Sequence, residues 1–565
     1  MGAEQVDVSK LKGAWPLYLL MSLYLVGVSR FWFLCDDAYI TFRYGRNWAR
    51  GYGLTFNPDG SPVEGYSNFL WTALSALVEG QLWSVERLMP LVSVATGVAL
   101  VLAIHRVARQ RLHLGPEASW LAAAAFAWFP AVAVWSTSGL ATMPFALLVF
   151  LCFEQLVWGR RPWVLFGVAI ALALIRVEGV LWLGVLVTLA GVAKVADDPL
   201  ASWRSTLEPW LRPLLAVASV YLVYTVWRVG HFGAWVPNTT HAKVDFGLGA
   251  VTRGFQYVAL FGLTFLPVAL WMGGVPRLLR SGRGVGVALT LLAVAFPMYA
   301  VLVGGDFFPM GRMLIPGLAF GALLFGAWVQ ALCEDPRPVV RHAATSVGIG
   351  VLLLNMLPGL DVHLVPHTWR EALHFRHSDK EFLSEVQRWE NMVDNTAGFR
   401  RRGLALAKLA HHDDTMVSQA IGAVGYYSGL HLYDQYGLVS REVALNVEAA
   451  DPQTQSPGHD KFVEASFFVD QDPDILHSRL VQGGLSTRLM KDSMEKWAVP
   501  DDLHTLYVPD FVEVDLAGEH KRSFLLWVRK PRPGEDPRRM WTTFPDRRKD
   551  LLADLTDDRA PQGVE

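Results

Sequence analysis

Acidic side chains stand at the ends of long apolar runs in this sequence. Asp36 and Asp37 follow the first run, and Asp306 follows two glycines after a later one. An ionised group at membrane depth costs at least ~2.5–3.5 kcal/mol, so a residue of this kind is a functional candidate. A carboxylate placed there can remove a proton from a hydroxyl group as a general base. The sequence therefore makes these aspartates candidates for a functional site.

Basic residues occupy similar positions and are suited to a phosphate group. A guanidinium group binds phosphate oxygens through two parallel hydrogen bonds and can stabilise the charge of a departing phosphate. The candidates for this role are Arg176, His241, Lys243 and Arg312. Together with Glu178 and the aspartates, they predict one pocket of acids and cations at the membrane surface. The alternative is that each charge only anchors a helix in the headgroup layer or pairs with a neighbour.

The composition indicates that the apolar runs cross a membrane. Only 18% of the 565 residues are charged, against roughly a quarter in an ordinary soluble protein, and the mean hydropathy is +0.27. Lys and Arg number 50 and Asp and Glu 52, which argues against a nucleic-acid binder because such a protein needs a basic face. The apolar runs end near residue 360, and the remaining sequence is typical of a soluble domain.

The first part of the chain, residues 1–360, is therefore predicted to be a polytopic α-helical membrane domain. A transmembrane helix needs about 20 predominantly apolar residues, and about eleven runs are candidates. The predicted spans are 14–33, 87–105, 117–135, 140–158, 162–176, 178–196, 211–229, 253–274, 284–303, 312–332 and 342–359.

Clusters of Arg and Lys set the predicted orientation, because positive residues concentrate in cytoplasmic connections. The basic clusters all fall in connections on one side of the membrane if the apolar stretch 67–83 lies at the membrane surface as a juxtamembrane helix and does not cross. The N-terminus is then cytoplasmic, and the first outer loop, residues 34–66, carries the paired aspartates. The domain after the last span then lies outside the cytoplasm.

Residues 361–565 are predicted to form a soluble α/β domain. A charged helical stretch at 380–409 comes first. The strand-like runs that follow are 415–420, 462–468, 505–515 and 523–530. Tyr426, Tyr427 and Asp434 offer ring faces and a carboxylate that suit binding of an acceptor sugar. The alternative for these three residues is an ordinary place in turns and in the core.

Nucleotide-binding and zinc-binding motifs are missing from the sequence. It contains no P-loop, no Rossmann fingerprint and no H-E-x-x-H pair, so a soluble nucleotide donor has no visible site. Cys35, Cys152 and Cys333 fall in unrelated segments and indicate neither a disulfide framework nor a cysteine metal cluster. A divalent metal near the carboxylates is left open, and no other cofactor is predicted.

Six ordered motifs resemble one known family. They are DDAYITFRYGRNWARGYGLTFNPDGSPVEGYSNFLW at 36–71, WSTSGLATMPF at 135–145, LIRVEG at 174–179, HFGAWVPNTTHAK at 231–243, GGDFFPMGRMLIP at 304–316 and GAVGYYSGLHLYDQYGLV at 422–439. The pattern resembles the polytopic GT-C glycosyltransferases close to the mycobacterial terminal β-(1→2)-arabinofuranosyltransferases, a group that includes bacterial proteins labelled flagellar motor control proteins. The similarity covers nearly the whole chain.

The resemblance implies a fold, an activity and partners. It implies an enzyme of the bacterial inner membrane that takes a sugar, arabinofuranose among the candidates, from a polyprenyl-phosphate carrier on the periplasmic face. It also implies a periplasmic C-terminal domain that helps bind an envelope glycan as acceptor. The general base would be an acidic residue of the first outer loop, here Asp36 or Asp37. With the residues named above, the predicted substrate-binding set is Arg43, Glu64, Arg176, Glu178, Asn238, His241, Lys243, Asp306 and Arg312.

The sequence departs from the family pattern in two of these motifs. The family commonly has a glutamate after S-G-L, whereas this sequence has Ala141, and the family's R-P-E-G is here an R-V-E-G that keeps both charges. If that glutamate has a direct role in relatives, this protein works differently from them. The alternative function is therefore a non-catalytic membrane protein, either a flippase for lipid carriers or an assembly factor for envelope or flagellar structures.

Overall fold

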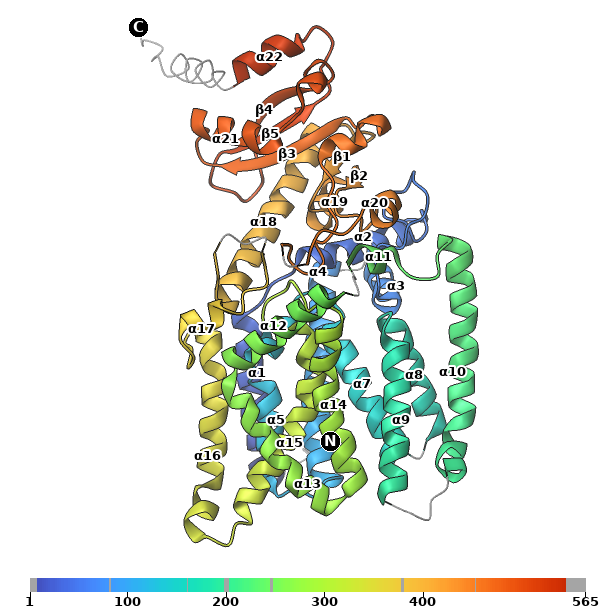
Figure 1. The fold of residues 1–565 in the computed structure, drawn as a ribbon, viewed down its shortest axis with the longest axis vertical. Coiled ribbons are helices and arrows are strands. Elements are labelled where there is room, and N and C mark those ends of the chain that lie inside the picture. Colours follow the sequence, from blue (N-terminus) through green and yellow to red (C-terminus); the bar gives the residue numbers. More distant parts are fainter. Residues whose placement is uncertain are drawn as a thin grey trace, which may run out of the picture.

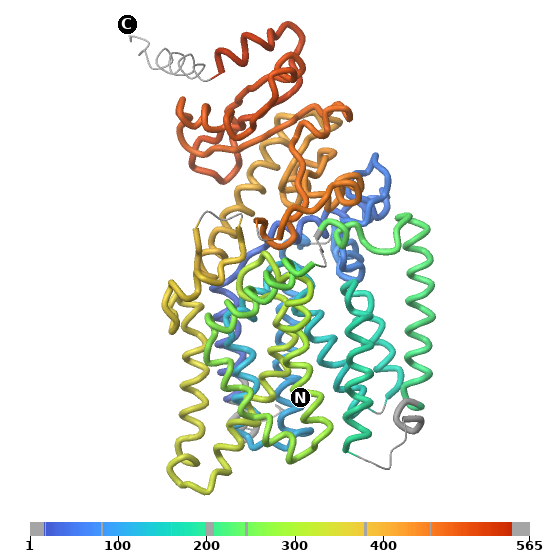
Figure 2. Tube along the Cα trace, viewed as in Figure 1, coloured from blue at the N-terminus to red at the C-terminus, as the bar shows by residue number. Residues whose placement is uncertain are grey.

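The computed structural model describes residues 8–80, 83–159, 161–197, 203–243, 247–377, 381–452 and 454–544. Long helices form a bundle at one end of the molecule, and a domain built around a β-sheet lies at the other end (Figure 1). The chain runs from the bundle, coloured blue to yellow, into the domain, coloured orange to red (Figure 2). The predicted fold class, a helical membrane part followed by an α/β domain, is confirmed.

Six helices in the described part of the chain are long and apolar enough to cross a membrane. They are α4 (Val85–Gln110), α9 (Gly179–Asp197), α10 (Trp203–Phe232), α14 (Arg283–Leu302), α15 (Ile315–Cys333) and α16 (Pro338–Met356). Shorter apolar helices are α7 (Thr142–Trp158), α8 (Pro162–Ile175) and the stretch Tyr18–Arg30 of α1 (Val8–Arg30). The protein is therefore a multi-pass membrane protein, whereas the predicted number of eleven spans is not confirmed.

Two predicted spans are broken in the structure, each beside a proline. The span predicted at 117–135 breaks before Pro130, and the span predicted at 253–274 breaks beside Pro267, where the two parts are bent by 88°. A proline cannot donate the backbone hydrogen bond that continues a helix. A straight helix was thus the wrong prediction at both places. The resulting elements are α5 (Pro116–Ala127), α6 (Pro130–Trp135), α12 (Leu248–Thr264), the 3₁₀ helix η1 (Leu266–Gly274) and α13 (Val275–Ser281).

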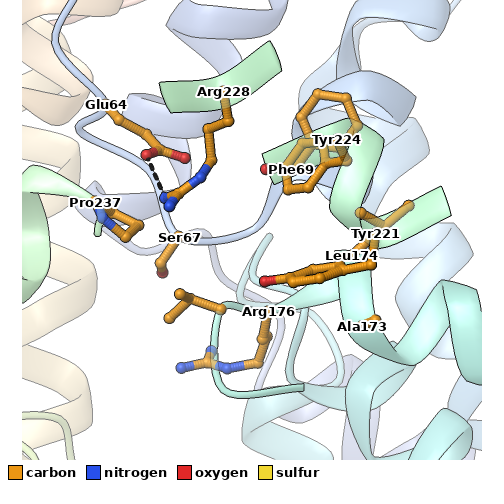
Figure 3. Close-up of a pocket in the computed structure, with 11 residues that line it drawn as sticks. Glu64, Ser67, Phe69, Ala173, Leu174, Arg176, Tyr221, Tyr224, Arg228 and Pro237 are labelled. Carbon is orange, nitrogen blue, oxygen red and sulfur yellow. Dashed lines mark hydrogen bonds and ion pairs between the residues drawn. The ribbon is translucent and has the colours of Figure 1, made fainter. Parts of the chain in front are cut away.

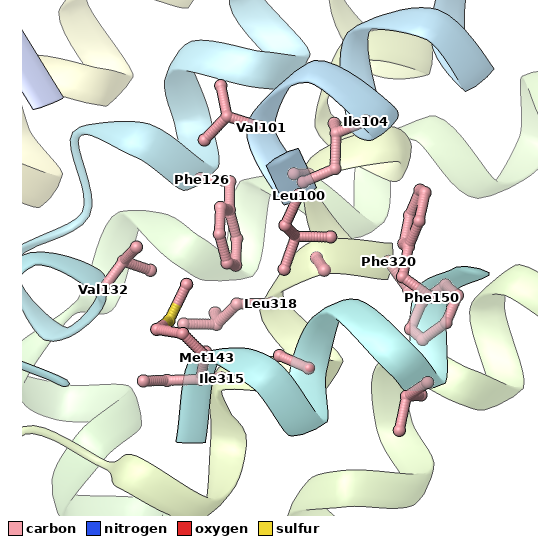
Figure 4. Close-up of a cluster of buried hydrophobic side chains, with 14 of the residues drawn as sticks. Leu100, Val101, Ile104, Phe126, Val132, Met143, Phe150, Ile315, Leu318 and Phe320 are labelled. Carbon is pink, nitrogen blue, oxygen red and sulfur yellow. The ribbon is translucent and has the colours of Figure 1, made fainter. Parts of the chain in front are cut away.

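The helix α15 lies at the centre of the bundle. Its residues Leu318 and Phe320 pack among apolar side chains of α4, α5 and α7 (Figure 4). Backbones also approach closely, since a Cβ atom at Gly274 would lie 1.8 Å from the carbonyl oxygen of Leu324. In lipid, helices associate through such close packing, because lipid tails are as apolar as the side chains. This packing fixes the relative positions of the helix ends that carry the charged residues.

Three short helices lie between the bundle and the C-terminal domain (Figure 1). They are α2 (Asp36–Ala49), α3 (Phe69–Val78) and α11 (Asn238–Lys243). The ten residues of α3 rise only about 15 Å, so this helix cannot cross a hydrocarbon core of about 30 Å by itself. The juxtamembrane place predicted for 67–83 stays a prediction, and residues 81–82 lie outside the described part.

The C-terminal domain is built on a five-stranded mixed sheet with the order β2-β1-β3-β5-β4. The strand β1 runs parallel to β2 and β3, whereas β5 pairs antiparallel with β3 and β4. The strands are β1 (Thr415–Ser418), β2 (His431–Asp434), β3 (Ile475–Gln482), β4 (Val508–Val514) and β5 (Ser523–Arg529). The helices after α16 are η3 (Leu357–Leu360), α17 (His367–Glu371), α18 (Glu385–Leu409), α19 (Gly422–Ser428), α20 (Arg441–Asn446), η4 (Ala465–Gln471), α21 (Thr487–Trp497), η5 (Asp501–Thr505) and α22 (Pro537–Thr543).

Three of the four predicted strand runs coincide with β1, β4 and β5. The run 462–468 was wrong as a strand, because it forms a loop and the start of η4. Phe468 is buried beside the sheet while Phe467 is exposed, so this apolar run packs as a turn. The strands β2 and β3 were not predicted, since β2 has four residues and β3 mixes polar with apolar ones.

Candidate active site

The start of α2 is held by a tight turn of the S-T-S-G-L motif. The backbone N–H of Cys35 donates to the carbonyl oxygen of Ser138 at 3.1 Å. Gly139 has a φ of +80°, and a Cβ atom there would lie 2.7 Å from the Cβ of Ala38. This close approach fixes the first turn of α2, where Asp36 and Asp37 lie. The positive end of the helix dipole favours carboxylates at this position.

The side chain of Asp36 is directed at the C-terminal domain. Its Oδ1 atom accepts a hydrogen bond from the backbone N–H of Ala423 at 2.7 Å, and its Oδ2 atom accepts one from Gly422 at 3.2 Å. Both donors belong to the first turn of α19, so Asp36 satisfies N–H groups that have no partner inside that helix. Burial raises the pKa of Asp36 to about 6 in spite of these bonds. The geometry thus gives Asp36 a role in joining α2 to α19.

The pKa of Asp36 predicts how stability changes with pH. Because this pKa rises from 3.8 to about 6 on folding, the folded state binds more protons between these values, and stability falls as pH rises through them. We expect this effect to reach about 3 kcal/mol and to disappear in Asp36→Asn. Thermal unfolding of both proteins between pH 4.5 and 7.5 measures it, with the exposed Asp413→Asn as a control. An unchanged pH slope in Asp36→Asn would contradict the expectation.

Asp306 and Arg312 form a buried ion pair between α14 and α15. The Nε atom of Arg312 donates to Oδ2 of Asp306 at 2.8 Å, and Nη2 donates to Oδ1 at 3.1 Å. The guanidinium group also lies over the ring of Phe308, 4.5 Å from its centre. The charge of Asp37 acts on the same guanidinium group, so Asp37 lies near this pair. Three charges predicted from two separate motifs therefore lie close together.

A pocket beside this pair contains two of the predicted arginines. Arg176, Glu178 and Arg312 line it together with Trp182 and Phe296, and its space of about 370 Å³ is partly open to solvent. The Nε atom of Arg176 donates to Glu178 at 2.5 Å. The rings of Trp182 and Phe296 stack with centres 3.7 Å apart and form an apolar wall. We call this the inner pocket; two guanidinium groups and an apolar wall suit a phosphate group on a lipid.

A second pocket adjoins the inner pocket at Arg176 (Figure 3). It encloses about 290 Å³, and Arg176 lines both spaces. Glu64 and Arg228 form an ion pair of 2.9 Å here, with Tyr221 and Tyr224 of α10 along one side. Burial raises the pKa of Glu64 to about 7, and the charge of Arg228 opposes this rise. We call this the side pocket.

Comparison with known proteins covers both parts of the chain. Residues 385–521 match the family described as Domain of unknown function (DUF8728). The chain is 28% identical over 364 residues to the terminal beta-(1->2)-arabinofuranosyltransferase of Corynebacterium glutamicum, a match that covers 53% of this chain and 50% of that protein. The chain thus spans about half the length of this curated relative.

Solved structures of ArnT from Cupriavidus metallidurans match nearly the whole chain. The apo structure has a TM-score of 0.54 at 12% identity and covers 92% of this chain and 98% of ArnT. The structure bound to undecaprenyl phosphate has a TM-score of 0.53 at 14% identity and covers 91% and 97%. The chain has the fold of ArnT. The resemblance that the six motifs indicated is confirmed by the sequence match to the arabinofuranosyltransferase together with this shared fold.

Several predicted site residues lie outside both pockets of this ArnT-like fold. The buried guanidinium group of Arg43 donates to the carbonyl oxygens of Phe56, Gly425 and Leu430. Asn238 donates to the carbonyl oxygen of Gly437 at 2.7 Å. Both side chains thus join the short helices α2 and α11 to the C-terminal domain. A binding role for Arg43 and Asn238 stays a prediction.

The residues predicted for acceptor binding lie within the C-terminal domain and its contact with α2. Asp434 accepts hydrogen bonds from the backbone of Tyr436 and Val439 and so stabilises a turn. Tyr426 and Tyr427 are half-buried and pack against Tyr39 of α2, with ring centres 5.5 and 5.6 Å apart. These contacts are those of core and turn residues, and an acceptor-binding role stays a prediction.

Two further predicted residues, His241 and Lys243, lie in α11 after Asn238. His241 is exposed and lines neither pocket. The side chain of Lys243 lies outside the described residues. Sequence reasoning missed Arg228, although a single arginine near the end of the apolar run 211–229 was a usable signal.

The described residues do not gather a set of metal ligands. No group of three His, Cys, Asp or Glu side chains in the described part of the chain could hold an ion. The two oxygens of Asp306 bind Arg312, and those of Asp36 bind backbone N–H groups. A divalent metal of the kind the sequence left open does not fit these residues as they are arranged, so no step below uses one.

Proposed function

We propose that this protein is a glycosyltransferase of the bacterial inner membrane that moves a sugar from a polyprenyl-phosphate donor to a hydroxyl group of an envelope glycan. The observation that carries the proposal is that Arg176 and Arg312 line the inner pocket, while Arg312 is paired with Asp306 and lies within reach of the charge of Asp37. The catalytic face is the periplasmic side, with the N-terminus in the cytoplasm. The structure of ArnT with undecaprenyl phosphate supports a lipid carrier of this class.

The residues divide the chemistry between them. Asp37 accepts the proton of the acceptor hydroxyl group while its oxygen attacks the anomeric carbon. The bond between that carbon and the phosphate oxygen breaks, and its electron pair leaves with the polyprenyl phosphate. Arg312 and Arg176 stabilise the negative charge that develops on this phosphate. Asp37 then releases its proton to water, and a single displacement of this kind inverts the anomeric centre.

The carboxylates beside the arginines orient them for this role. Asp306 occupies Nε and Nη2 of Arg312, and Glu178 occupies Nε of Arg176. The Nη1 atom of Arg312 and the Nη atoms of Arg176 then bind the phosphate oxygens. A guanidinium group fixed in this way needs little reorganisation as charge develops on the phosphate. The same carboxylates prevent an excess of positive charge in the apolar surroundings when the donor is absent.

The sugar in this proposal is arabinofuranose. Its support is the arabinofuranosyltransferase of Corynebacterium glutamicum, which is similar over half of its own length. The acceptor is an envelope glycan that reaches Asp37 from the side of the C-terminal domain, because α2 lies between that domain and the bundle (Figure 1).

Transfer by the purified full chain in proteoliposomes tests the function. Polyprenyl-phosphoarabinose and polyprenyl-phosphomannose serve as donors, and envelope glycan from a strain that lacks the gene serves as acceptor. We expect the arabinose donor to yield extended glycan and free polyprenyl phosphate in equal amounts. Movement of the intact donor across the bilayer without release of polyprenyl phosphate would instead support a flippase. If the protein neither transfers the sugar nor moves the donor, the result would support an assembly factor.

A further inference from the structure

The loop that carries Asp306 and Arg312 has an unusual backbone. We call residues 304–312 the GGD loop. Gly304 and Gly305 have φ values of +83° and +81°, and Met310 has a φ of +60° although it is not a glycine. A side chain in this left-handed region is strained, so the conformation persists only where the surroundings impose it.

The first set of surrounding contacts comes from the start of α18 and the segment before it. The carboxylate of Glu385 accepts a hydrogen bond from the backbone N–H of Met310. It also pairs with Arg376 at 2.8 Å, and both side chains are more than nine-tenths buried. Arg376 in turn donates to the carbonyl oxygens of Phe307 at 2.9 Å and Phe308 at 3.0 Å. Three backbone groups of the GGD loop are thus bound by one ion pair.

The second set of contacts comes from the loop that contains Asp460. Its carboxylate binds Arg253 of α12 through two hydrogen bonds of 2.5 and 3.1 Å. The two side chains are 2% and 3% exposed. The Nε atom of Arg253 donates to the carbonyl oxygen of Gly304 at 3.3 Å. A second buried pair therefore holds the other end of the GGD loop.

The same domain also holds the helix that carries Asp37. Asp36 accepts hydrogen bonds from the first turn of α19, and Arg43 donates to the carbonyl oxygens of Gly425 at 2.6 Å and Leu430 at 2.7 Å. The helix α2 and the GGD loop are far apart in sequence. The helix α2 follows α1, whereas the GGD loop follows α14. Both are attached to residues within 385–521, the range of the domain of unknown function.

We propose that this domain is a clamp that sets the distance between Asp37 and the Asp306–Arg312 pair. Glu385 and Asp460 of this domain, with Arg376 from the segment before it, act as positioning residues that touch the GGD loop or its partner Arg253 and not the substrate. The catalytic consequence of the clamp rests on the proposed function, whereas its effect on the loop does not. Removing one partner of a buried ion pair leaves an uncompensated charge, so each pair is sensitive to a single substitution.

Hydrogen–deuterium exchange of the full chain in lipid nanodiscs tests the clamp directly. In Asp460→Asn and Glu385→Gln, we expect the backbone N–H groups of peptides covering 304–312 to exchange at least about ten-fold faster than in the wild type, as in a local opening. Peptides from the centre of α15 should be unchanged. Arg253→Lys keeps the positive charge and loses the two-pronged binding of Asp460, so its exchange rate in 304–312 should lie between those of the wild type and Asp460→Asn. This milder variant keeps the test possible if the other two fold poorly.

A matched control separates the clamp from a general loss of domain stability. Asp510 pairs with Arg529 at 2.6 Å inside the sheet, and both side chains are as buried as those of the clamp. Asp510→Asn removes one of the two carboxylates that bind Arg529, the other being Glu535, and this pair does not touch the GGD loop. We expect exchange in 304–312 to stay at the wild-type rate in this variant. Equal acceleration in Asp510→Asn and Asp460→Asn would overturn the proposal.

Kinetics supply a second readout that depends on the proposed function. Donor binding is expected to persist while the alignment of base and phosphate is lost, so kcat should fall about ten-fold in Asp460→Asn with the donor KM unchanged. An equal rise in KM with kcat unchanged would contradict a positioning role. If the wild type transfers no sugar, the proposed function fails, and the exchange rates still decide whether the clamp exists.

Discussion

Asp37→Asn is expected to lower kcat for sugar transfer by about 10²–10⁴-fold, the contribution of a positioned general base. Asp37 lies in the first turn of α2, near enough to the Asp306–Arg312 pair for its charge to act on Arg312. Asparagine has nearly the same volume and cannot accept the proton of the acceptor hydroxyl group. The donor is bound by other residues, so its KM should stay within about three-fold of the wild-type value. Initial rates over a range of donor concentrations in proteoliposomes measure both constants.

The neighbouring aspartate provides the matched control for this experiment. Asp36→Asn makes the same chemical change one residue away, where both carboxylate oxygens bind α19. We expect a loss of less than about ten-fold in kcat, because this variant disturbs the position of α2 without removing the base. Equal losses in the two variants, or full activity of Asp37→Asn, would contradict the assignment of the base to Asp37.

The meeting of the charged residues could be predicted from the sequence for a physical reason. Ionisable groups are costly beside apolar helices, so the few that occur there have been retained for a role. Arg176, Glu178, Asp306 and Arg312 each stand at the end of an apolar run, and the structure brings three of them to the inner pocket. The fourth, Asp306, binds Arg312 directly.

The different places of Asp36 and Asp37 could not be predicted. Successive residues of a helix point about 100° apart, so which carboxylate faces the bundle depends on where α19 packs against α2. That contact joins residues nearly 400 positions apart. The sequence around the two aspartates gives no information on this contact. The two residues can therefore be told apart only when the position of the C-terminal domain against α2 is known.

The partners of the GGD loop were missed for a related reason. Glu385 and Asp460 lie in segments that read as ordinary charged surface of a soluble domain, and only the fold brings them against the loop. Asn238 and Asp434 show the opposite case, because both bind backbone groups of turns in the structure while their predicted binding roles stay predictions. A short polar side chain that satisfies backbone groups in a turn has the same appearance in sequence as one that binds a ligand.

The second large effect concerns the ion pair beside the base. Arg312→Gln removes the cation that faces the departing phosphate, and we expect kcat/KM to fall by about 10²–10³-fold, as for the loss of one donor to a developing oxyanion. It also leaves the buried Asp306 carboxylate without its partner, which costs about 3–5 kcal/mol of stability. The single variant should therefore be less active and less stable at once, so activity alone does not show which loss is the cause.

The double variant Asp306→Asn/Arg312→Gln separates these two effects. It replaces the ion pair with two neutral amides of similar shape, so neither side chain is left as a lone buried charge, and most of the lost thermal stability should return. Activity should not return, because no guanidinium group is present to stabilise the leaving phosphate. Thermal unfolding and initial rates are measured on the wild type, on Arg312→Gln and on the double variant in the same lipid. Recovery of activity together with stability would show that Arg312 acts only through the fold, and the phosphate would then have to be bound by Arg176.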